Sequence, residues 1–226
     1  AAPPLGGVAQ SSEKPNILLI LVDDLGYGDL SSYGSGDIET PRIDELMSQG
    51  IRFDQFYSNC TVCSPTRASL MTGRYPDIAG VPGVVRQKAA NSWGYLDPAA
   101  LTLPDMLKTG GYDTAMIGKW HLHSHPVGFD FWRILPGQGA YYNPDFIEMD
   151  GSRQRYVGHC NDLVTDFGIK WMAEDRDTEK PFVAMIQFKA PHRNWSAAER
   201  HLNLFKGVQM PEPKTLFDDY ANRSKV

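Results

Sequence analysis

The sequence lacks a long apolar run. Its longest strongly apolar stretch, Ile17–Val22, is followed at once by Asp23 and Asp24. A helix needs about 20 predominantly apolar residues to span a bilayer, so the sequence predicts no transmembrane segment. Residues 1–14 also lack the apolar core of a signal peptide, and their Ala, Pro, Gly and Ser content predicts a flexible tail or linker.

The sequence also lacks an excess of positive charge and a full set of cysteines. A formal net charge of -5 disfavours a broad surface for nucleic acid or anionic membrane. Three cysteines, Cys60, Cys63 and Cys160, cannot form a disulfide framework, and their odd number leaves at least one thiol unexplained. Cys60 and Cys63 alone are spaced as in a redox pair or half of a zinc site.

The pattern of apolar residues predicts alternating strands and helices. With 226 residues, of which 42% are hydrophobic, the chain is long enough for one domain or the greater part of a larger one. Expected strands are Ile17–Val22, Tyr112–Ile117 and Pro181–Phe188, and expected helices are Thr40–Gly50, Leu103–Lys108 and Asn161–Glu174. This order predicts an α/β fold, a mostly parallel sheet sandwiched by helices, with Ile17–Val22 as a strand covered on both faces.

Polar clusters follow the three expected strands. Asp23 and Asp24 end the first, Lys119 and His121 lie past the second, and Lys189–Trp195 follows the third. Ligands of open α/β sheets bind outside the carboxyl ends of strands, so the sequence predicts a site there. Two Gly-rich or Pro-rich segments are expected to be long loops that carry specificity. These are Pro76–Pro98 and Gly128–Asp145.

Cys63 stands at the predicted start of another helix. Ser64 suits the N-cap, Pro65 the first helical position, and Gly73 the end of that helix. The free N–H groups of the first turn, with Arg67 one turn further, would bind a small oxyanion. By itself the segment also permits an inert buried thiol at Cys63 and a surface ion pair for Arg67.

Several segments together resemble the type I sulfatases of the alkaline-phosphatase-like superfamily. Their signature, Cys-x-Pro-x-Arg with a later Leu-x-Thr-Gly-Arg, stands here as Cys63-Ser-Pro-Thr-Arg67 and Leu70-Met-Thr-Gly-Arg74, with Thr66 in place of the usual Ser. Three further segments resemble the opening strand, the second signature and the sulfate-binding histidine segment of the family. These are Asn16–Asp29, Gly118-Lys-Trp-His121 and Ala190-Pro-His192.

The resemblance implies a metal site built on a modified cysteine. Cys63 would be converted to formylglycine by a formylglycine-generating enzyme. The modified residue, Asp23 and Asp24 would bind a metal ion, usually Ca²⁺ with Mg²⁺ as the alternative. Carboxylates and hydroxyls are the oxygen ligands that these hard cations prefer.

The same resemblance assigns catalytic roles to four further residues. Arg67 would hold the modified residue, and Lys119 would bridge the aldehyde hydrate and the sulfate. His121 would bind the hydrate and His192 the sulfate or the leaving oxygen. Because a sulfate ester is an anion that repels nucleophiles, such cations are what its hydrolysis requires. We expect replacement of Cys63 or Arg67 to abolish sulfate release with little loss of fold.

The family's chain is longer than this one. It completes the metal site with a downstream Asp-Asn or similar pair and a later Lys. Two pairs in this sequence are not acceptable substitutes: Asp218-Asp219 does not follow a predicted strand, and Asn161-Asp162 begins a predicted helix. We therefore expect residues 15–226 to be the N-terminal part of a sulfatase catalytic domain, whose C-terminal portion is absent from this chain.

The loops Gly128–Asp145 and Lys189–Trp195 resemble those of bacterial sulfatases that act on sulfated sugars, notably N-acetylglucosamine 6-sulfate units. Such enzymes imply a periplasmic or extracellular location. The alternatives are a phosphodiester or phosphonate monoester hydrolase of the same superfamily, and an inactive fragment or thiol-binding module. The remaining histidines lack motif support and are expected to be ordinary surface or core residues. They are His123, His125, His159 and His201.

Overall fold

The computed structural model describes residues 14–86 and 94–224. Most of the predicted tail, residues 1–13, lies outside the described residues, as do residues 87–93 of one predicted loop. The strands are β1 (Ile17–Asp23), β2 (Asp113–Lys119), β3 (Phe131–Leu135), β4 (Asp145–Ile147), β5 (Arg153–Arg155) and β6 (Phe182–Pro191). The helices are α1 (Pro41–Ser48), α2 (Cys63–Thr72), α3 (Leu103–Thr109) and α4 (Cys160–Lys170), which a π-helix, η3 (Trp171–Asp175), extends; η1 (Ser31–Tyr33) and η4 (Glu199–His201) are 3-10 turns.

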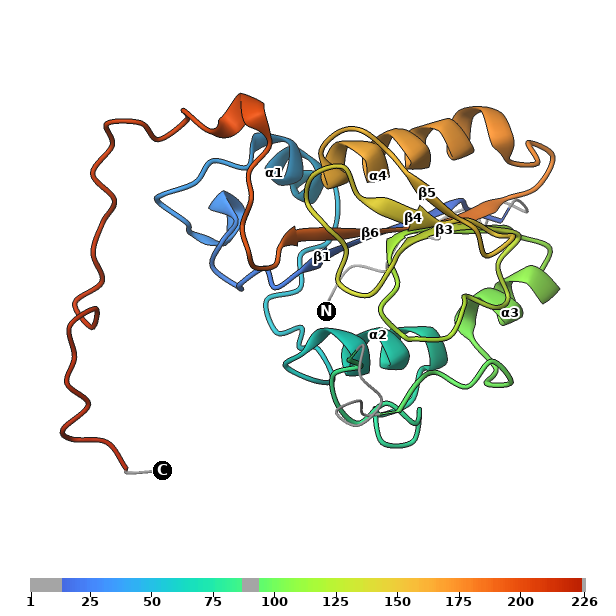
Figure 1. The fold of residues 1–226 in the computed structure, drawn as a ribbon, viewed down its shortest axis with the longest axis horizontal. Helices are drawn as coiled ribbons and strands as arrows, with labels where there is room; N and C mark the ends of the chain where they lie inside the picture. Colours follow the sequence, from blue (N-terminus) through green and yellow to red (C-terminus); the bar gives the residue numbers. More distant parts are fainter. Residues whose placement is uncertain (1–13, 87–93, 225–226) are drawn as a thin grey trace, which may run out of the picture. The chain divides into compact units, whose positions relative to one another are not determined.

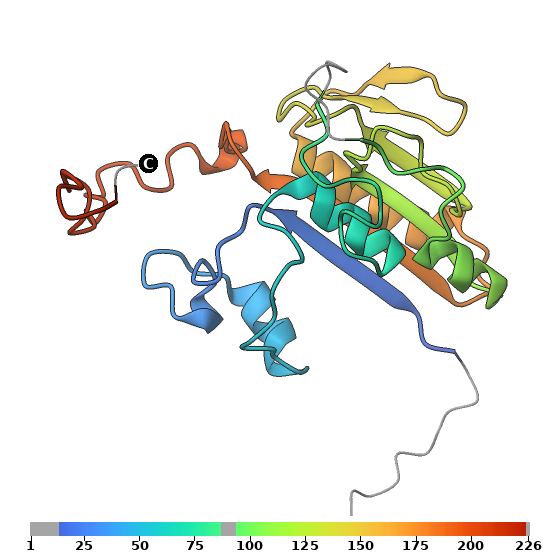
Figure 2. The ribbon, with the colours of Figure 1, turned by 90° about the horizontal axis from the view of Figure 1, so that it is seen from below.

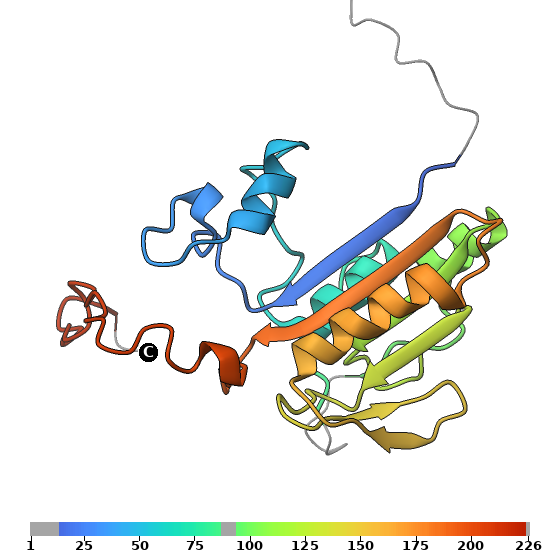
Figure 3. The same ribbon diagram turned by 90° about the horizontal axis from the view of Figure 1, so that it is seen from above.

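The strands form one sheet in the order β1-β6-β2-β3-β4-β5. β1, β6, β2 and β3 run parallel, whereas β4 and β5 are antiparallel additions. Helices α2 and α3 cover one face, and α4 covers the other (Figures 1, 2 and 3). The predicted α/β fold with a helix-covered, mostly parallel sheet is therefore confirmed.

Alternate side chains of the central strands supply two separate cores. On the α2 side, Met116 of β2 and Met185 of β6 pack with Met71. On the α4 side, Ile117 and Ile186 belong to the second cluster. Strand β6 is buried over most of its length, and its sequence is accordingly a largely apolar run. Strand β2 is also buried throughout, but its apolar run is limited to Ala115–Ile117.

Two predictions about the fold were wrong. The segment Gly128–Asp145 is not a single loop, because it contains β3, in which Trp132 and Ile134 are buried against the α2 side. The run Ile17–Val22 is a strand, but it lies at the sheet edge, and Leu18 and Ile20 are about half exposed. The prediction was made because its apolar sequence is typical of a strand with both faces covered. Among the described residues, however, no segment covers both of its faces fully.

The described residues from 196 to 224 form a unit of their own, which contains the short turn η4. Among the described residues, no helix is both long and apolar enough to cross a membrane.

Gly118 is the tightest point of the central sheet. Its φ is +105°, a conformation that side chains rarely adopt, and a Cβ there would overlap the carbonyl oxygen of Gln187 on neighbouring β6. We expect Gly118→Ala to lower the free energy of unfolding by about 3 kcal/mol, because the strands must separate to admit the methyl group. Urea denaturation followed by circular dichroism measures this change.

The matched control is Gly36→Ala, since Gly36 has no heavy atom within 4 Å of the added Cβ and no positive φ. We expect this control to unfold within about 0.5 kcal/mol of the wild type. Equal stability of the two variants would contradict the close approach of β2 and β6 at Gly118.

Candidate active site

The carboxyl ends of β1, β2 and β6 meet at one edge of the sheet, as the sequence predicted. They bring together Asp23 at the end of β1 and Lys119 at the end of β2. Lys119 is the last residue of its strand rather than a loop residue. Parallel strands leave their carboxyl ends on the same side, which is why residues almost 100 positions apart share this site.

A buried ion cluster forms the floor of the site. The Lys119 ammonium donates to Asp23 Oδ2, and Arg67 Nη2 lies 3.4 Å from Asp23 Oδ1. All three side chains are almost completely buried. Burial lowers the pKa of Lys119, and the Asp23 carboxylate opposes this shift. Asp23 thus holds two cations in an environment where an unpaired charge is costly.

Arg67 ties α2 to the sheet. Its Nη1 donates to the carbonyl oxygen of Lys119 and to Gln187 Oε1. Burial lowers the pKa of the guanidinium, whereas the Asp23 carboxylate raises it. An arginine with partners on β1, β2 and β6 is part of the core, so its replacement will affect the fold as well as the site. The sequence had led us to expect that replacing Arg67 would hardly affect folding; its buried contacts lead us to expect a loss of stability instead.

Cys63 lies in the first turn of α2, and its Sγ is 3.2 Å from His121 Nδ1. The other ring nitrogen, Nε2, lies 2.9 Å from the carbonyl oxygen of Val85. Because a carbonyl oxygen can only accept a hydrogen bond, Nε2 carries the proton and donates. A neutral His121 therefore presents Nδ1 as an acceptor to Cys63. Burial and, next, the charge of Lys119 lower the pKa of His121 to about 4.

Ser64 differs from its predicted role. The helix begins at Cys63 with Val62 as the N-cap residue, so Ser64 is not the cap. Its hydroxyl oxygen accepts from the Val85 N–H at 3.1 Å and lies 3.2 Å from His121 Nδ1. Ser64 thus fixes the His121 ring and the Val85 segment relative to the start of α2. The predicted end of the helix is confirmed, because Gly73 is left-handed with φ 66°.

Asp24 and His192 lie at the outer, more exposed side of the site. Asp24 follows β1 with φ 65°, and its carboxylate is half exposed. His192 Nε2 lies 3.7 Å from Asp24 Oδ2, and Nδ1 is 2.6 Å from the carbonyl oxygen of Arg193. Tyr141 donates to the backbone carbonyl of His192, which anchors the segment after β6. The third predicted strand end therefore also reaches the site.

A cavity of about 330 Å³ lies beside Cys63, and we call it the catalytic pocket. Asp23, Asp24, Cys63 and Arg67 line it. Two carboxylates beside residue 63 are oxygen ligands of the kind that Ca²⁺ or Mg²⁺ prefers, but six or more are needed. Within the described part of the chain, no three His, Cys, Asp or Glu side chains are grouped to hold a metal ion. The donor set fits part of such a site.

Sequence reasoning missed the buried Gln187 and the half-buried Gln138 of this region, and it assigned no contact to Lys189. Gln187 binds Arg67, and Gln138 Oε1 accepts from the Lys119 ammonium at 2.5 Å. Lys189, also buried, donates to the Gln138 carbonyl oxygen at 3.1 Å, and its ammonium stands 4.8 Å from the Tyr141 ring centroid. Gln187 and Lys189 interrupt an otherwise apolar strand, and that interruption was the available signal.

The cysteines are free thiols. Cys60 and Cys63 are half-buried and Cys160 is buried. Cys60 also lines the catalytic pocket, but its side chain makes no described hydrogen bond to His121. Its carbonyl oxygen accepts from the Thr66 and Ser58 hydroxyls. Thr66, the departure from the usual Ser, is thereby held within the turn that presents Cys63.

Comparisons with known proteins identify the family of the chain. A protein-family model described as Sulfatase matches residues 15–225. The N-acetylglucosamine-6-O-sulfatase of Bacteroides thetaiotaomicron is 41% identical over 226 residues, which cover 96% of this chain and 38% of that protein. Arylsulfatase A of Homo sapiens is 46% identical over 154 residues, 68% of this chain and 28% of that protein.

Similar folds occur among solved structures. A protein solved in complex with its substrate, D-glucosamine-2-N,6-O-disulfate, superimposes with a TM-score of 0.84 and 42% sequence identity over 94% of this chain and 42% of that one. The chain thus spans less than half the length of each of these relatives.

Proposed function

Because the chain belongs to the sulfatase family, we propose that the protein hydrolyses sulfate esters of a carbohydrate through a formylglycine derived from Cys63. The observation that carries this proposal is the position of Cys63. It begins a helix, faces the acceptor nitrogen of His121, and lines a pocket with Asp23 and Asp24. A helix start and nearby cations favour an oxyanion at this place.

The substrate class follows from the relatives. One is named an N-acetylglucosamine-6-O-sulfatase, and a structural relative was solved with a disulfated glucosamine as its substrate. We infer that a 6-sulfated N-acetylglucosamine or glucosamine unit, as occurs in glycosaminoglycans, is the substrate.

A bound metal ion would be held by Asp23, Asp24 and the modified residue 63, with further ligands from outside the described residues. When bound, it would stabilise negative charge on the sulfate and lower the pKa of the attacking hydroxyl. Arg67 and Lys119 pair with Asp23 in the structure described here, and both interact electrostatically with residue 63. His192, at the outer side of the site, would donate a proton to the departing sugar oxygen.

The hydrate of formylglycine explains why a modified cysteine suits this reaction. One of its two hydroxyls loses its proton to solvent and attacks sulfur, and the S–O bond to the sugar breaks as the sugar oxygen takes a proton from His192. His121 Nδ1 then accepts the proton of the second hydroxyl, the C–O bond to sulfate breaks, and the aldehyde forms again. Addition of water restores the hydrate. A serine ester would lack this second hydroxyl.

Two measurements test the proposal. Intact-mass analysis should find the aldehyde, which is lighter than the Cys63 thiol by about the mass of one water molecule, and a hydrazide label should react with it. Sulfate should be released from N-acetylglucosamine 6-sulfate. An active protein with unmodified Cys63 would contradict the nucleophile. Faster turnover of an aryl phosphonate than of an aryl sulfate would favour the phosphonate hydrolase alternative, and tightly bound zinc would favour the thiol alternative.

Chelation should remove the activity reversibly. We expect the rate of sulfate release to fall at least about 100-fold after EDTA treatment and dialysis, because the negative charge that develops on the sulfate would then lack the metal ion that stabilises it. Added Ca²⁺ or Mg²⁺ should restore it, and the ion that restores more identifies the preferred metal. Full activity with no detectable metal would exclude Asp23 and Asp24 as metal ligands.

We propose that maturation requires a formylglycine-generating enzyme and that the protein works in the periplasm or outside the cell. The support for both is the family resemblance and the intact Cys63-Ser-Pro-Thr-Arg67 segment.

A further inference from the structure

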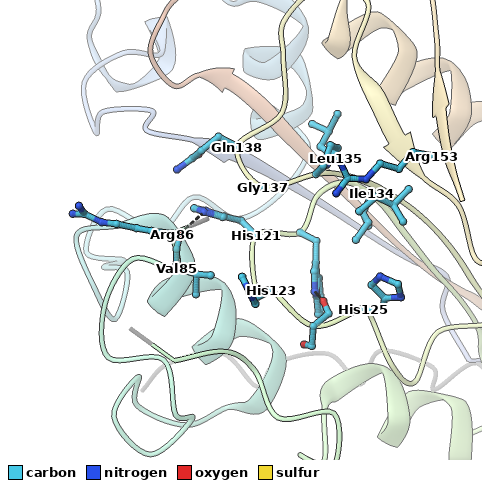
Figure 4. Close-up of a pocket in the computed structure, with 14 residues that line it drawn as sticks. Val85, Arg86, His121, His123, His125, Ile134, Leu135, Gly137, Gln138 and Arg153 are labelled. Carbon is cyan, nitrogen blue, oxygen red and sulfur yellow. Dashed lines mark hydrogen bonds between the residues drawn. The ribbon is translucent and has the colours of Figure 1, made fainter. Parts of the chain in front are cut away.

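A second and larger cavity adjoins the catalytic pocket, and we call it the cationic pocket (Figure 4). It has a volume of about 530 Å³ and opens between the segment after β2, the end of β3 and strand β5. Its polar lining includes Arg86, His121, His123, His125, Gln138 and Arg153. The mechanism proposed above uses only His121 among them.

The charge of this pocket is one-sided. Two arginines and three histidines line it, and no Asp or Glu does, although acids outnumber bases in the chain as a whole. The Arg153 guanidinium has no ion-pair or hydrogen-bond partner among the described residues, in contrast to Arg155 on the same strand, which binds Asp145 at 2.9 Å. An arginine left with its donors available beside other donors is suited to a carboxylate or a sulfate.

The cationic pocket is connected to the site of reaction by two side chains. His121 lines it while its Nδ1 faces Cys63 at 3.2 Å. Gln138 lines it while its Oε1 accepts from Lys119. Figure 4 shows His121 and Gln138 on one side of the pocket and Arg153 with His125 on the other. A ligand held at Cys63 would therefore have its neighbouring substituents beside this pocket.

We propose that the cationic pocket binds a second anionic group, a sulfate or a carboxylate, of the same carbohydrate whose sulfate ester lies at Cys63. This inference rests on the proposed function and adds a substrate preference to it. Arg153 supplies a charged, bidentate contact, and His123 and His125 supply ring N–H donors. His123 and His125, two of the four histidines expected to be ordinary surface or core residues, thus belong to a specificity site.

Its test compares two substrates of the formylglycine-carrying protein. These are N-acetylglucosamine 6-sulfate and D-glucosamine-2-N,6-O-disulfate. We expect the wild type to have a kcat/KM about tenfold or more higher for the disulfate, because one charged hydrogen-bonded contact has about this effect. The Arg153→Gln variant should lose most of that preference. Arg155→Gln, which removes a charge from the same strand outside the pocket, should keep the wild-type preference.

A binding measurement separates this inference from the proposed function. In a Cys63→Ala background, calorimetric titration should show tighter binding of the disulfate than of the monosulfate, and Arg153→Gln should remove that difference. This result would support the pocket even if sulfate release failed. A wild type without preference, or an equal preference in the Arg153→Gln and Arg155→Gln variants, would overturn it. A pocket already filled by an acidic side chain would also give no preference for the disulfate, and that outcome would overturn the inference.

Discussion

Replacing Cys63 with alanine is expected to lower the rate of sulfate release by about 10⁴-fold or more, because alanine lacks the thiol that must be oxidised to give the aldehyde. The fold should persist. Cys63 is half-buried, its one described side-chain contact is to His121, and Ser64 still bonds to that ring. Sulfate release, measured with circular dichroism on the same samples, checks both parts.

Cys60→Ala is the matched control. Cys60 lies one turn before Cys63 and is also half-buried, but its described contacts are made by its carbonyl oxygen, which alanine retains. We expect this variant to keep turnover within about twofold of the wild type. Equal losses in the two variants would point to a general disturbance of the segment and away from a nucleophile at Cys63.

Arg67→Ala should have the largest effect on stability. The change leaves Asp23 with one cation instead of two and leaves Gln187 Oε1 and the Lys119 carbonyl oxygen without their shared donor. Loss of one partner from a buried ion pair costs about 3 to 5 kcal/mol, and we expect a decrease of that size in the free energy of unfolding. Chemical denaturation of the metal-free protein measures it.

Arg74→Ala provides the comparison, because Arg74 follows the same helix but is exposed. Its free energy of unfolding should stay within about 0.5 kcal/mol of the wild type. If Arg67→Ala were as stable as this control, the Arg67 side chain would not hold α2 against the sheet, and its role would be confined to the reaction.

The sequence predicted those elements whose signals are local. The helix at Leu103 was expected from Thr102 and the glycines after it, and the structure shows Thr102 and Asp105 as a capping box. Strand β3 was missed because the contacts that stabilise it are made by residues distant in the sequence. Arg133 in its centre looks unsuited to a sheet, but its guanidinium lies 2.9 Å from Glu148 and 4.3 Å from the Phe167 ring centroid.

The site shows the same division. The sequence located the strand-end residues and Cys63, because strand ends and helix starts leave a pattern in the chain. It did not show that Ser64 would bind His121 or that Gln138 would join Lys119 and Lys189. Those contacts depend on how loops far apart in the chain approach each other, and hydrophobic periodicity contains no information about that.

Strand β1 has a practical consequence for the 226-residue chain prepared on its own. It is an edge strand, and its apolar side chains, Leu18 and Ile20 among them, are about half exposed. Unpaired N–H and C=O groups beside exposed apolar side chains offer a template for strands of other molecules. Such a preparation is therefore expected to aggregate as its concentration rises, and a lysine at Ile20 should delay aggregation by placing a charge on the open edge.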